Sequence, residues 1–349
     1  MTIRSRITGG VDTHLDVHVA AALDERGGLL GVELFATTPA GYQRLLSWLQ
    51  AFGEVVLVGV EGTGSYGAGL TRVLHAHQVP VVEVDRPNRQ RRRRRGKSDP
   101  QDAISAARAA QSGEASGLAK TRDGNVEAMR VLRVARGSAR RSRTQALNQM
   151  RALVSTAPDE IRNELRDLNA RRLLERTSSY RPGQRRDVNA LTRFALRTLA
   201  RRAIALETEV DEIDKILKML TTDTAPELMA INGVGTDVAS ALLVAAGDNP
   251  ERLRSEATFA HLCGVAPIDA SSGKNERHRL NRGGDRQANS ALWHIVITRM
   301  ACDQHTRTYI ARRMDQGRTK KEAIRCLKRY IAREIYHQLP RRQLTLDNP

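Results

Sequence analysis

Four carboxylate residues stand where a predicted strand ends or a predicted helix begins. Asp12 lies at the end of the first apolar run, and Glu61 closes the run EVVLVGVE. Asp99 and Asp102 are three residues apart at the start of a helical segment, so both project from one face. Acids at strand ends converge at one rim of a sheet, where they repel one another unless cations hold them. These residues predict a site for two Mg²⁺ ions that assists displacement at phosphorus.

Each acid also has a simpler interpretation. An isolated Asp after a strand is often a turn residue or a cap, and Asp99-Pro100 fits a helix start with Asp99 as the N-cap. Asp16 competes with Asp12, but it lies inside the second apolar run, on a different predicted strand. The order of all four acids along the predicted frame is what favours a metal site.

A second candidate for chemistry is the loop APIDASSGKNERHRLNRGG, in which a serine precedes a glycine among basic residues. A serine hydroxyl needs a base or a metal before it can attack phosphorus. His278 is the one evident base nearby in the sequence, so activation from the distant acids is an alternative. A phosphate-binding loop with an inert serine is another interpretation.

Hydrophobic patterns predict the elements that must position these residues. Three short apolar runs separated by turn signals predict a meander of strands over residues 7–36. PAGYQRLLSWLQAF and SYGAGLTRVLHAHQV have helical spacing, while EVVLVGVE and PVVEVD are runs typical of buried strands. The predicted order is βββαβαβ, an α/β sheet domain.

After about residue 123 the strand signals stop. A long basic helix with a rough heptad covers residues 132–153, and a second helix with apolar residues at steps of three and four covers 196–220. RPGQRRD, at 181–187, is the predicted turn between them. The pattern favours a coiled coil or helical hairpin that acts as a spacer and oligomerisation element.

The C-terminal third is predicted to be helical again. ELMAINGVGTDVASALLVAAG predicts two helices joined at Gly233 and Gly235, where a phosphate could approach backbone N–H groups. A plain helix–turn–helix packing unit is the alternative. The tail TKKEAIRCLKRYIAREIYHQL predicts a basic amphipathic helix.

The charge balance indicates a polyanionic partner. The chain of 349 residues holds 57 Lys and Arg against 39 Asp and Glu, a net charge of +18. Neutralised phosphates release counterions, which favours nucleic acid over the alternative of a merely solvated basic surface. Aromatic residues make up only 3%, which argues against recognition based mainly on base stacking.

Composition also limits the compartment. Cys263, Cys302 and Cys326 show no paired spacing, so neither a disulfide framework nor a zinc site is expected. No apolar run approaches the ~18–20 residues that span a bilayer, and the start MTIRSRITGG lacks a secretory signal. We expect a cytoplasmic protein without a membrane partner.

Several motifs together resemble the DEDD serine transposases of bacterial insertion sequences, which are RNA-guided bridge recombinases. They are GVDTHLDVHVAA, VGVEGTGSYG, KSDPQDA, LMAINGVG, FAHLCGVAP, SSGK and RGGDRQAN. The resemblance covers nearly the whole chain. It implies a RuvC-like RNase H-fold catalytic domain over residues 1–120 and a helical coiled-coil region over 121–222. A mainly α C-terminal transposase domain with a helix-hairpin-helix-like segment is implied for 223–349.

The resemblance also implies a mechanism and partners. The four acids would bind Mg²⁺, and the family's nucleophilic serine falls on Ser272, with the adjacent Ser271 as an alternative. The family forms a phosphoserine link to DNA, in a site composed from two protomers. Implied partners are donor and target DNA, a structured bridge RNA that pairs with both, and further copies of the chain in a dimer or tetramer.

Basic residues near the two candidate sites are expected to hold the nucleic-acid backbone. They are Arg91, Arg92, Arg93, Arg94, Arg95, Lys97, Lys274, Arg277, Arg279, Arg282 and Arg286. The terminal helix is expected to contribute in the same way, because its charge is basic along its length.

Three competing functions stay open at this point. A Holliday-junction-type nuclease would use the same acids with water as the nucleophile. A non-catalytic nucleic-acid-binding protein would carry vestigial acids. An actin-like ATPase or sugar kinase shares the βββαβα start, but the basic middle region and the absence of an evident second copy of that pattern count against it.

Overall fold

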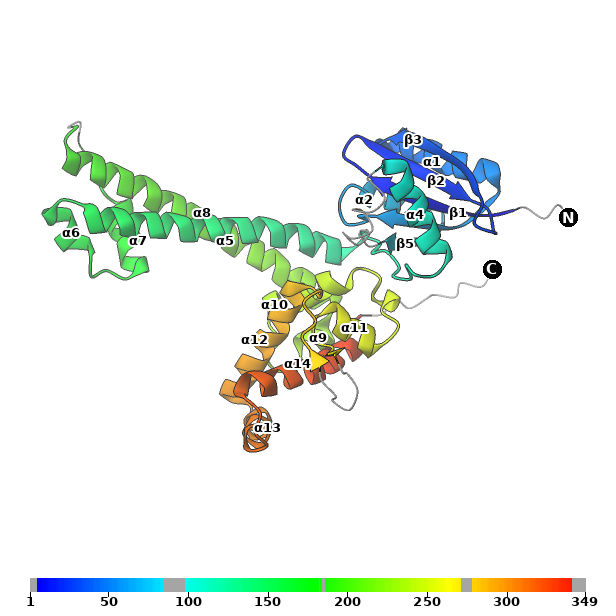
Figure 1. Ribbon diagram of the computed structural model, residues 1–349. Helices are drawn as coiled ribbons and strands as arrows, with labels where there is room; N and C mark the ends of the chain where they lie inside the picture. Colours follow the sequence, from blue (N-terminus) through cyan, green and yellow to red (C-terminus); the bar gives the residue numbers. More distant parts are fainter. Residues whose placement is uncertain (1–4, 85–97, 182, 184–185, 271–277, 341–349) are drawn as a thin grey trace. The chain divides into compact units, whose positions relative to one another are not determined.

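The computed structural model describes residues 5–84, 98–181, 183, 186–270 and 278–340. They form two compact units (Figure 1). Apart from the undescribed residues, the first unit comprises Met1–Gly124, Ala246–Leu262 and Leu339–Pro349, and the second comprises Asn125–Ala245 and Cys263–Gln338. The first holds a mixed α/β sheet, and the second is mostly helical.

A five-stranded sheet with the order β3-β2-β1-β4-β5 is the frame of the first unit (Figure 1). Strands β1, β2 and β3 pair antiparallel, whereas β4 pairs parallel with both β1 and β5. The strands are β1 (Arg6–Thr13), β2 (Val17–Leu23), β3 (Leu29–Ala36), β4 (Glu54–Glu61) and β5 (Val81–Val84). The predicted βββαβαβ order is confirmed, with β1 at the centre of the sheet between β2 and β4.

Helices α1 (Pro39–Phe52) and α2 (Ala68–Ala76) supply the apolar residues that cover one face of the sheet. Helix α1 begins where Thr38 accepts a hydrogen bond from the Gly41 N–H, and Pro39 fixes its first turn. Alternate residues of β1 and β4 join leucines of both helices in one buried core. This core is formed by Ile7, Val11, Val58, Val60, Leu45, Leu49, Leu70 and Leu74, among others.

The opposite face is covered by α4 (Asp99–Gln111), which lies directly on the strand backbones. A Cβ placed on Gly10 would overlap backbone atoms of α4, and one on Gly59 would lie 2.6 Å from the Ala106 carbonyl oxygen. A Cβ on the neighbouring Gly9 would instead meet Leu49 of α1, because successive residues of a strand face opposite sides. Gly10 and Gly59 therefore permit the close approach of α4.

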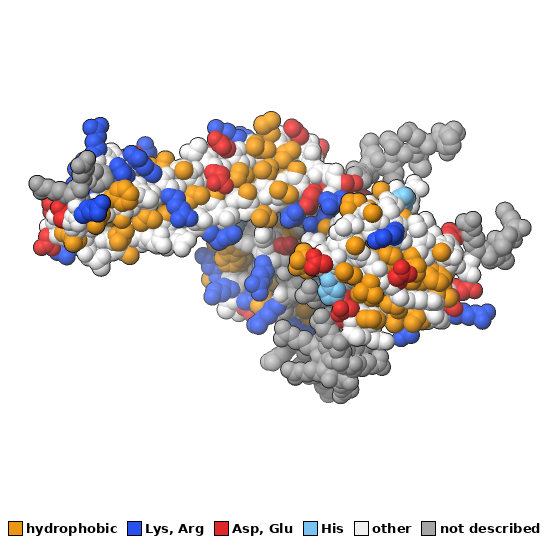
Figure 2. Space-filling model, turned by 90° about the horizontal axis from the view of Figure 1, so that it is seen from above, with side chains coloured by type: hydrophobic (Ala, Val, Ile, Leu, Met, Phe, Trp, Pro, Cys, Tyr) orange, Lys and Arg blue, Asp and Glu red, His pale blue; other side chains and the backbone are white. Residues whose placement is uncertain are grey.

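The second unit contains an arm made of α5 (Asn125–Thr156) and α8 (Val188–Thr224), which pack against each other. The predicted apolar pattern is partly confirmed, since Ala146, Met150 and Leu196 are buried, whereas Ala135 is exposed. Figure 2 shows Lys and Arg side chains interspersed with hydrophobic ones along this arm.

The connection between the two arm helices is longer than predicted. Helices α6 (Asp159–Leu165) and α7 (Ala170–Ser178) lie between them, so residues 181–187 are only its last part. Apolar residues of both helices, Ile161 and Leu173 among them, close the end of the arm's core. Because each helix spans about two turns, neither shows enough periods to be recognised in the sequence.

Helices of 3 to 18 residues and a two-stranded ribbon form the rest of the described chain. They are α9 (Pro226–Met229), α10 (Thr236–Ala246), η1 (Pro250–Arg252), α11 (Glu256–Leu262), β6 (Ile268–Asp269), β7 (His278–Arg279), α12 (Arg286–Cys302), α13 (Gln304–Asp315) and α14 (Lys320–His337). The two-residue strands correct the prediction that strands end near residue 123, since pairs this short leave no periodic signal. Within the described part of the chain, no helix has the length and apolar character needed to cross a membrane.

Candidate active site

Asp12 and Glu61 lie at the ends of the neighbouring strands β1 and β4. The register pairs Val11 with Val60, so the next residue of each strand lies at the same rim. Both acids share the strand face of Gly10 and Gly59, the face on which α4 packs. Their exposed fractions are 5% and 7%, unusually low for carboxylates. The Thr13 hydroxyl donates to the Glu61 carbonyl oxygen at 2.7 Å and ties the strand ends together.

Asp99 and Asp102 occupy the first turn of α4, beside Asp12. Ser98 holds the N-cap position and Asp99 is the first helical residue, so the alternative of Asp99 as the N-cap is wrong. Asp12 experiences electrostatic repulsion from both acids. The structure thus brings three of the four predicted acids together and places Glu61 on the strand next to Asp12.

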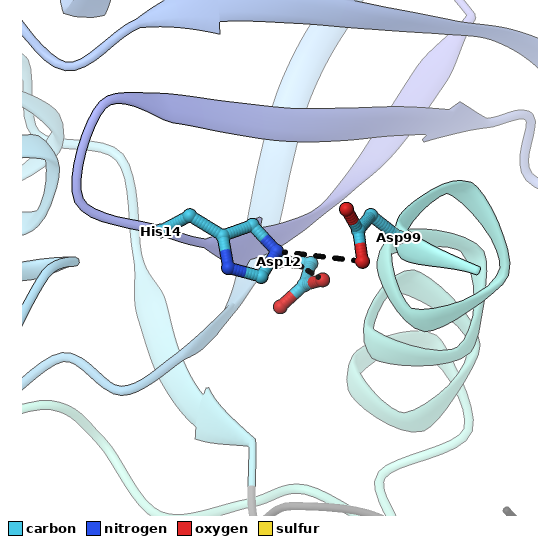
Figure 3. A group of neighbouring side chains, drawn as sticks. All are labelled: Asp12, His14 and Asp99. Atoms are coloured by element: carbon cyan, nitrogen blue, oxygen red, sulfur yellow. Dashed lines mark hydrogen bonds and ion pairs between the residues drawn. The ribbon is translucent and has the colours of Figure 1, made fainter. Parts of the chain in front are cut away.

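His14 belongs to this cluster although the sequence did not single it out. Its Nε2 lies 3.1 Å from Asp12 Oδ2 and 3.6 Å from Asp99 Oδ1 (Figure 3). The residue follows β1, and its imidazole turns back towards the strand end (Figure 3). The available signal was its position two residues after Asp12 in GVDTHLD, a spacing too common to stand alone.

The donor set fits a divalent cation. One ligand atom from each of Asp12, His14 and Asp99 lies within 4.8 Å of the others. Carboxylate oxygens suit Mg²⁺, and an imidazole nitrogen extends the range towards transition metals. Burial raises the pKa of Asp12; His14 opposes the shift, and Asp102 and Asp99 reinforce it. A bound cation would relieve the cost of keeping these carboxylates charged.

The raised pKa of Asp12 has a measurable consequence for the metal-free protein. A pKa above the unfolded value gives stability that is present at low pH and lost as the pH rises through the folded pKa. At neutral pH without divalent metal, we expect Asp12→Asn to melt a few degrees above wild type. The difference in melting temperature between the two proteins should decrease as the pH is lowered towards 4 in paired thermal scans. A wild type that melts higher than the variant at neutral pH would contradict this electrostatic account.

The remaining predicted site residues are placed as follows. Asp16 lies exposed in the bend before β2, not inside a strand, and so does not compete with Asp12. Arg279, Arg282 and Arg286 lie in the second unit and line a cavity. Outside the described residues are Arg91, Arg92, Arg93, Arg94, Arg95, Lys97, Ser271, Ser272, Lys274 and Arg277.

Two family models match different parts of the chain. Residues 9–172 match a family model of DEDD transposases of the IS110 type, and residues 225–311 match the Transposase IS116/IS110/IS902 family. The chain carries the transposase domains of the IS110 family. The first matched range contains the four acids, and the second contains the serine loop.

Two insertion-element proteins are among the relatives of this chain. It is 36% identical over 104 residues to the "Insertion element IS110 uncharacterized 43.6 kDa protein" of Streptomyces coelicolor, over 29% of this chain. It is 24% identical over 151 residues to the "Insertion element IS900 uncharacterized 42 kDa protein" of Mycobacterium paratuberculosis, over 42% of this chain. The matched parts cover 25% and 37% of these two relatives.

Proposed function

We propose that this IS110-family chain is a transposase that cuts and rejoins DNA by Mg²⁺-assisted phosphoryl transfer. The observation that carries the proposal is the cluster of Asp12, His14 and Asp99 at the rim of the sheet, with Glu61 on the next strand. An acidic site on a sheet rim suits two-metal chemistry on a phosphodiester. The net charge of +18 over the whole chain suits a polyanionic substrate.

The first unit is proposed to be an RNase H-like, RuvC-like domain. Support comes from its strand order β3-β2-β1-β4-β5, with an antiparallel meander followed by parallel strands. An actin-like ATPase would contain this frame twice, whereas the described residues contain it once, in the first unit. We keep residues 1–120, 121–222 and 223–349 as the proposed functional domains, with the arm as a coiled-coil element for oligomerisation.

Asp12, Glu61, Asp99 and Asp102 would hold the metal ions. When bound, the ions would neutralise charge on the reacting phosphate and lower the pKa of the attacking hydroxyl. The chain's own residues set the geometry: β1 and β4 hold Asp12 and Glu61 in register, and the first turn of α4 presents the other two acids. His14, within reach of Asp12 and Asp99, would orient both carboxylates through its Nε2.

Ser272 is the proposed nucleophile, with Ser271 as the adjacent alternative. Its Oγ would attack phosphorus, the leaving strand would depart with a hydroxyl end, and the chain would hold a phosphoserine ester. The reverse attack by a DNA hydroxyl would rejoin the strand without ATP. We further propose that acids of one protomer meet the serine of another, in a dimer or tetramer. A bridge RNA would pair with donor and target DNA and supply the sequence specificity.

A Holliday-junction-type nuclease that uses water is the alternative function. The arrangement that favours it is the acidic cluster itself, which is assembled within the first unit. Such an enzyme would cut DNA without conserving the phosphodiester bond, so only cut ends and no rejoined strands would form.

Strand exchange with matched serine variants separates the two functions. The purified protein is incubated with Mg²⁺, its element's junction DNA and the RNA transcribed from that element. We expect recombinant strands from wild type and from Ser271→Ala, and none from Ser272→Ala or in the presence of a chelator. Cutting that Ser272→Ala retains in full, without strand exchange, would assign the water-using nuclease instead.

A further inference from the structure

A cavity of about 970 Å³ lies in the second unit, within residues 264–330. Its walls come from the turn at residues 264–267, strand β7 and helices α12, α13 and α14. The volume is at the upper end of the range of about 300–1,000 Å³ that ligand sites occupy. Three of the lining residues, Arg279, Arg282 and Arg286, are those predicted from the sequence to hold the nucleic-acid backbone, so the inference drawn from this cavity rests in part on the proposed function.

The cavity is strongly basic. Among the described residues that line it, nine carry cationic side chains and one, Glu322, carries a carboxylate. That carboxylate is held at the start of α14, where it accepts hydrogen bonds from the backbone N–H and hydroxyl of Thr319, each at 2.8 Å. So dense an excess of positive charge in a concave surface concentrates an anionic ligand.

One of these cations is buried. Lys328 is 8% exposed, and its Nζ donates to Asn289 Oδ1 at 2.7 Å. Asn289 is fixed in turn by donating to the carbonyl oxygens of Cys263 and Gly264 at 2.8 and 3.2 Å. Burial and the neighbouring Arg325 lower the pKa of Lys328. A lysine has three N–H donors, and Asn289 accepts one of them, so the Lys328 ammonium is held in place on the cavity wall with further donors.

Two aromatic side chains stand beside the cations. Trp293 and Tyr330 line the cavity and are 38% and 58% exposed. Tyr330 is supported edge-on by Tyr309, with ring centroids 6.0 Å apart. Exposed aromatic rings next to phosphate-binding cations stack nucleic-acid bases. The low aromatic content of the whole chain argues against stacking as the main mode of recognition, so stacking at this cavity would add to phosphate contacts rather than replace them.

We propose that this cavity binds a segment of single-stranded nucleic acid, with phosphates on its cations and a base on Tyr330, the more exposed of the two rings. The phosphates of a duplex could contact the cations, but its bases are stacked inside the double helix and cannot reach the aromatic rings. An acidic peptide could pair with the cations, but it would not account for the two exposed aromatic rings. DNA and RNA share the chemistry required, and binding here does not depend on the proposed cleavage reaction.

Fluorescence anisotropy of the full chain in EDTA tests the site, with probes of about 12 nucleotides, within the usual site sizes. The probes are oligothymidylate, oligouridylate, an abasic strand with the same phosphates, and a duplex. We expect oligothymidylate to bind about tenfold more tightly than the abasic strand because of stacking. Comparing thymidylate with uridylate shows which nucleic acid is preferred.

Matched variants locate the binding. Lys321 lines the cavity and its neighbour Lys320 does not, although both are exposed. Lys321→Gln should weaken all single strands and reduce the salt slope by about 0.7, whereas Lys320→Gln should change little. Tyr330→Ala should remove the preference for thymidylate over the abasic strand, while Tyr330→Phe retains it.

Two results would overturn the proposal. Equal losses for Lys321→Gln and Lys320→Gln would show diffuse surface charge and no cavity site. Duplex bound as tightly as single strands, with Tyr330→Ala without effect, would show contact with duplex backbone alone. Because EDTA prevents cleavage, failure of the proposed catalysis leaves these measurements unaffected.

Discussion

Asp12→Asn is expected to reduce strand cutting by at least about 100-fold, since even the outer partners of metal ligands contribute 10–100-fold. Asn keeps the size of the side chain, so β1 and α4 should stay packed. It removes the charge at the most buried carboxylate of the cluster, which is 5% exposed and lies against His14 and Asp99. The measurement is cutting of the element's end DNA under single-turnover conditions, with Mg²⁺ in excess.

Asp16→Asn is the matched control for this loss. It makes the same chemical change four residues later, at an exposed bend with no part in the cluster. We expect its cutting rate to stay within about twofold of wild type, as surface changes away from special features have small effects. Equal loss in both variants, or full activity in Asp12→Asn, would contradict the assignment of the acidic site.

Gly10→Ala is expected to lower both stability and activity, although the residue bears no functional group. The added methyl would overlap the backbone of α4 at Ala103 and Ala107, which cannot move as a flexible side chain can. Overpacking typically lowers the free energy of unfolding by about 1–3 kcal/mol. Because the overlap here is with backbone atoms, we expect a loss at the upper end of this range. Displacement of α4 would also move Asp99 and Asp102 away from Asp12. We therefore expect both the rate of DNA cutting and the urea concentration at the unfolding midpoint to decrease.

Gly117→Ala provides the control for that prediction. A Cβ at Gly117 meets no atom within 4 Å, and its carbonyl keeps the hydrogen bond from the Glu83 N–H. The free energy of unfolding should change by less than about 0.5 kcal/mol. If Gly10→Ala unfolds at the same urea concentration as wild type, α4 does not rest on β1 as described.

Much of the sheet could be predicted because each strand is a compact apolar run between turn signals. The positions of the four acids could be predicted, because strand ends and helix starts are visible in the pattern; their role as metal ligands stays a prediction. His14 could not, since its role depends on a bend that folds its ring back towards Asp12. Lys328 was likewise hidden, because its place opposite Asn289 depends on how α12 and α14 pack.

The close approach of α4 also lies beyond single-sequence reasoning. In the sequence, Gly10 and Gly59 only weaken the strand pattern. Their role in the packing of α4 becomes evident once the position of that helix is known. The short α6 and α7 left too few periods to detect, which is why the arm connection was predicted to be shorter than it is.

The central claim is tested most directly by trapping the covalent intermediate. The protein is expressed with its native flanking DNA, the lysate is denatured, and protein–DNA adducts are isolated and mapped by mass spectrometry. The account predicts a nucleotide-bearing peptide modified at Ser272 in wild type and in Ser271→Ala, and no adduct in Ser272→Ala. Cut DNA without any adduct, at the same rate in wild type and Ser272→Ala, would contradict it.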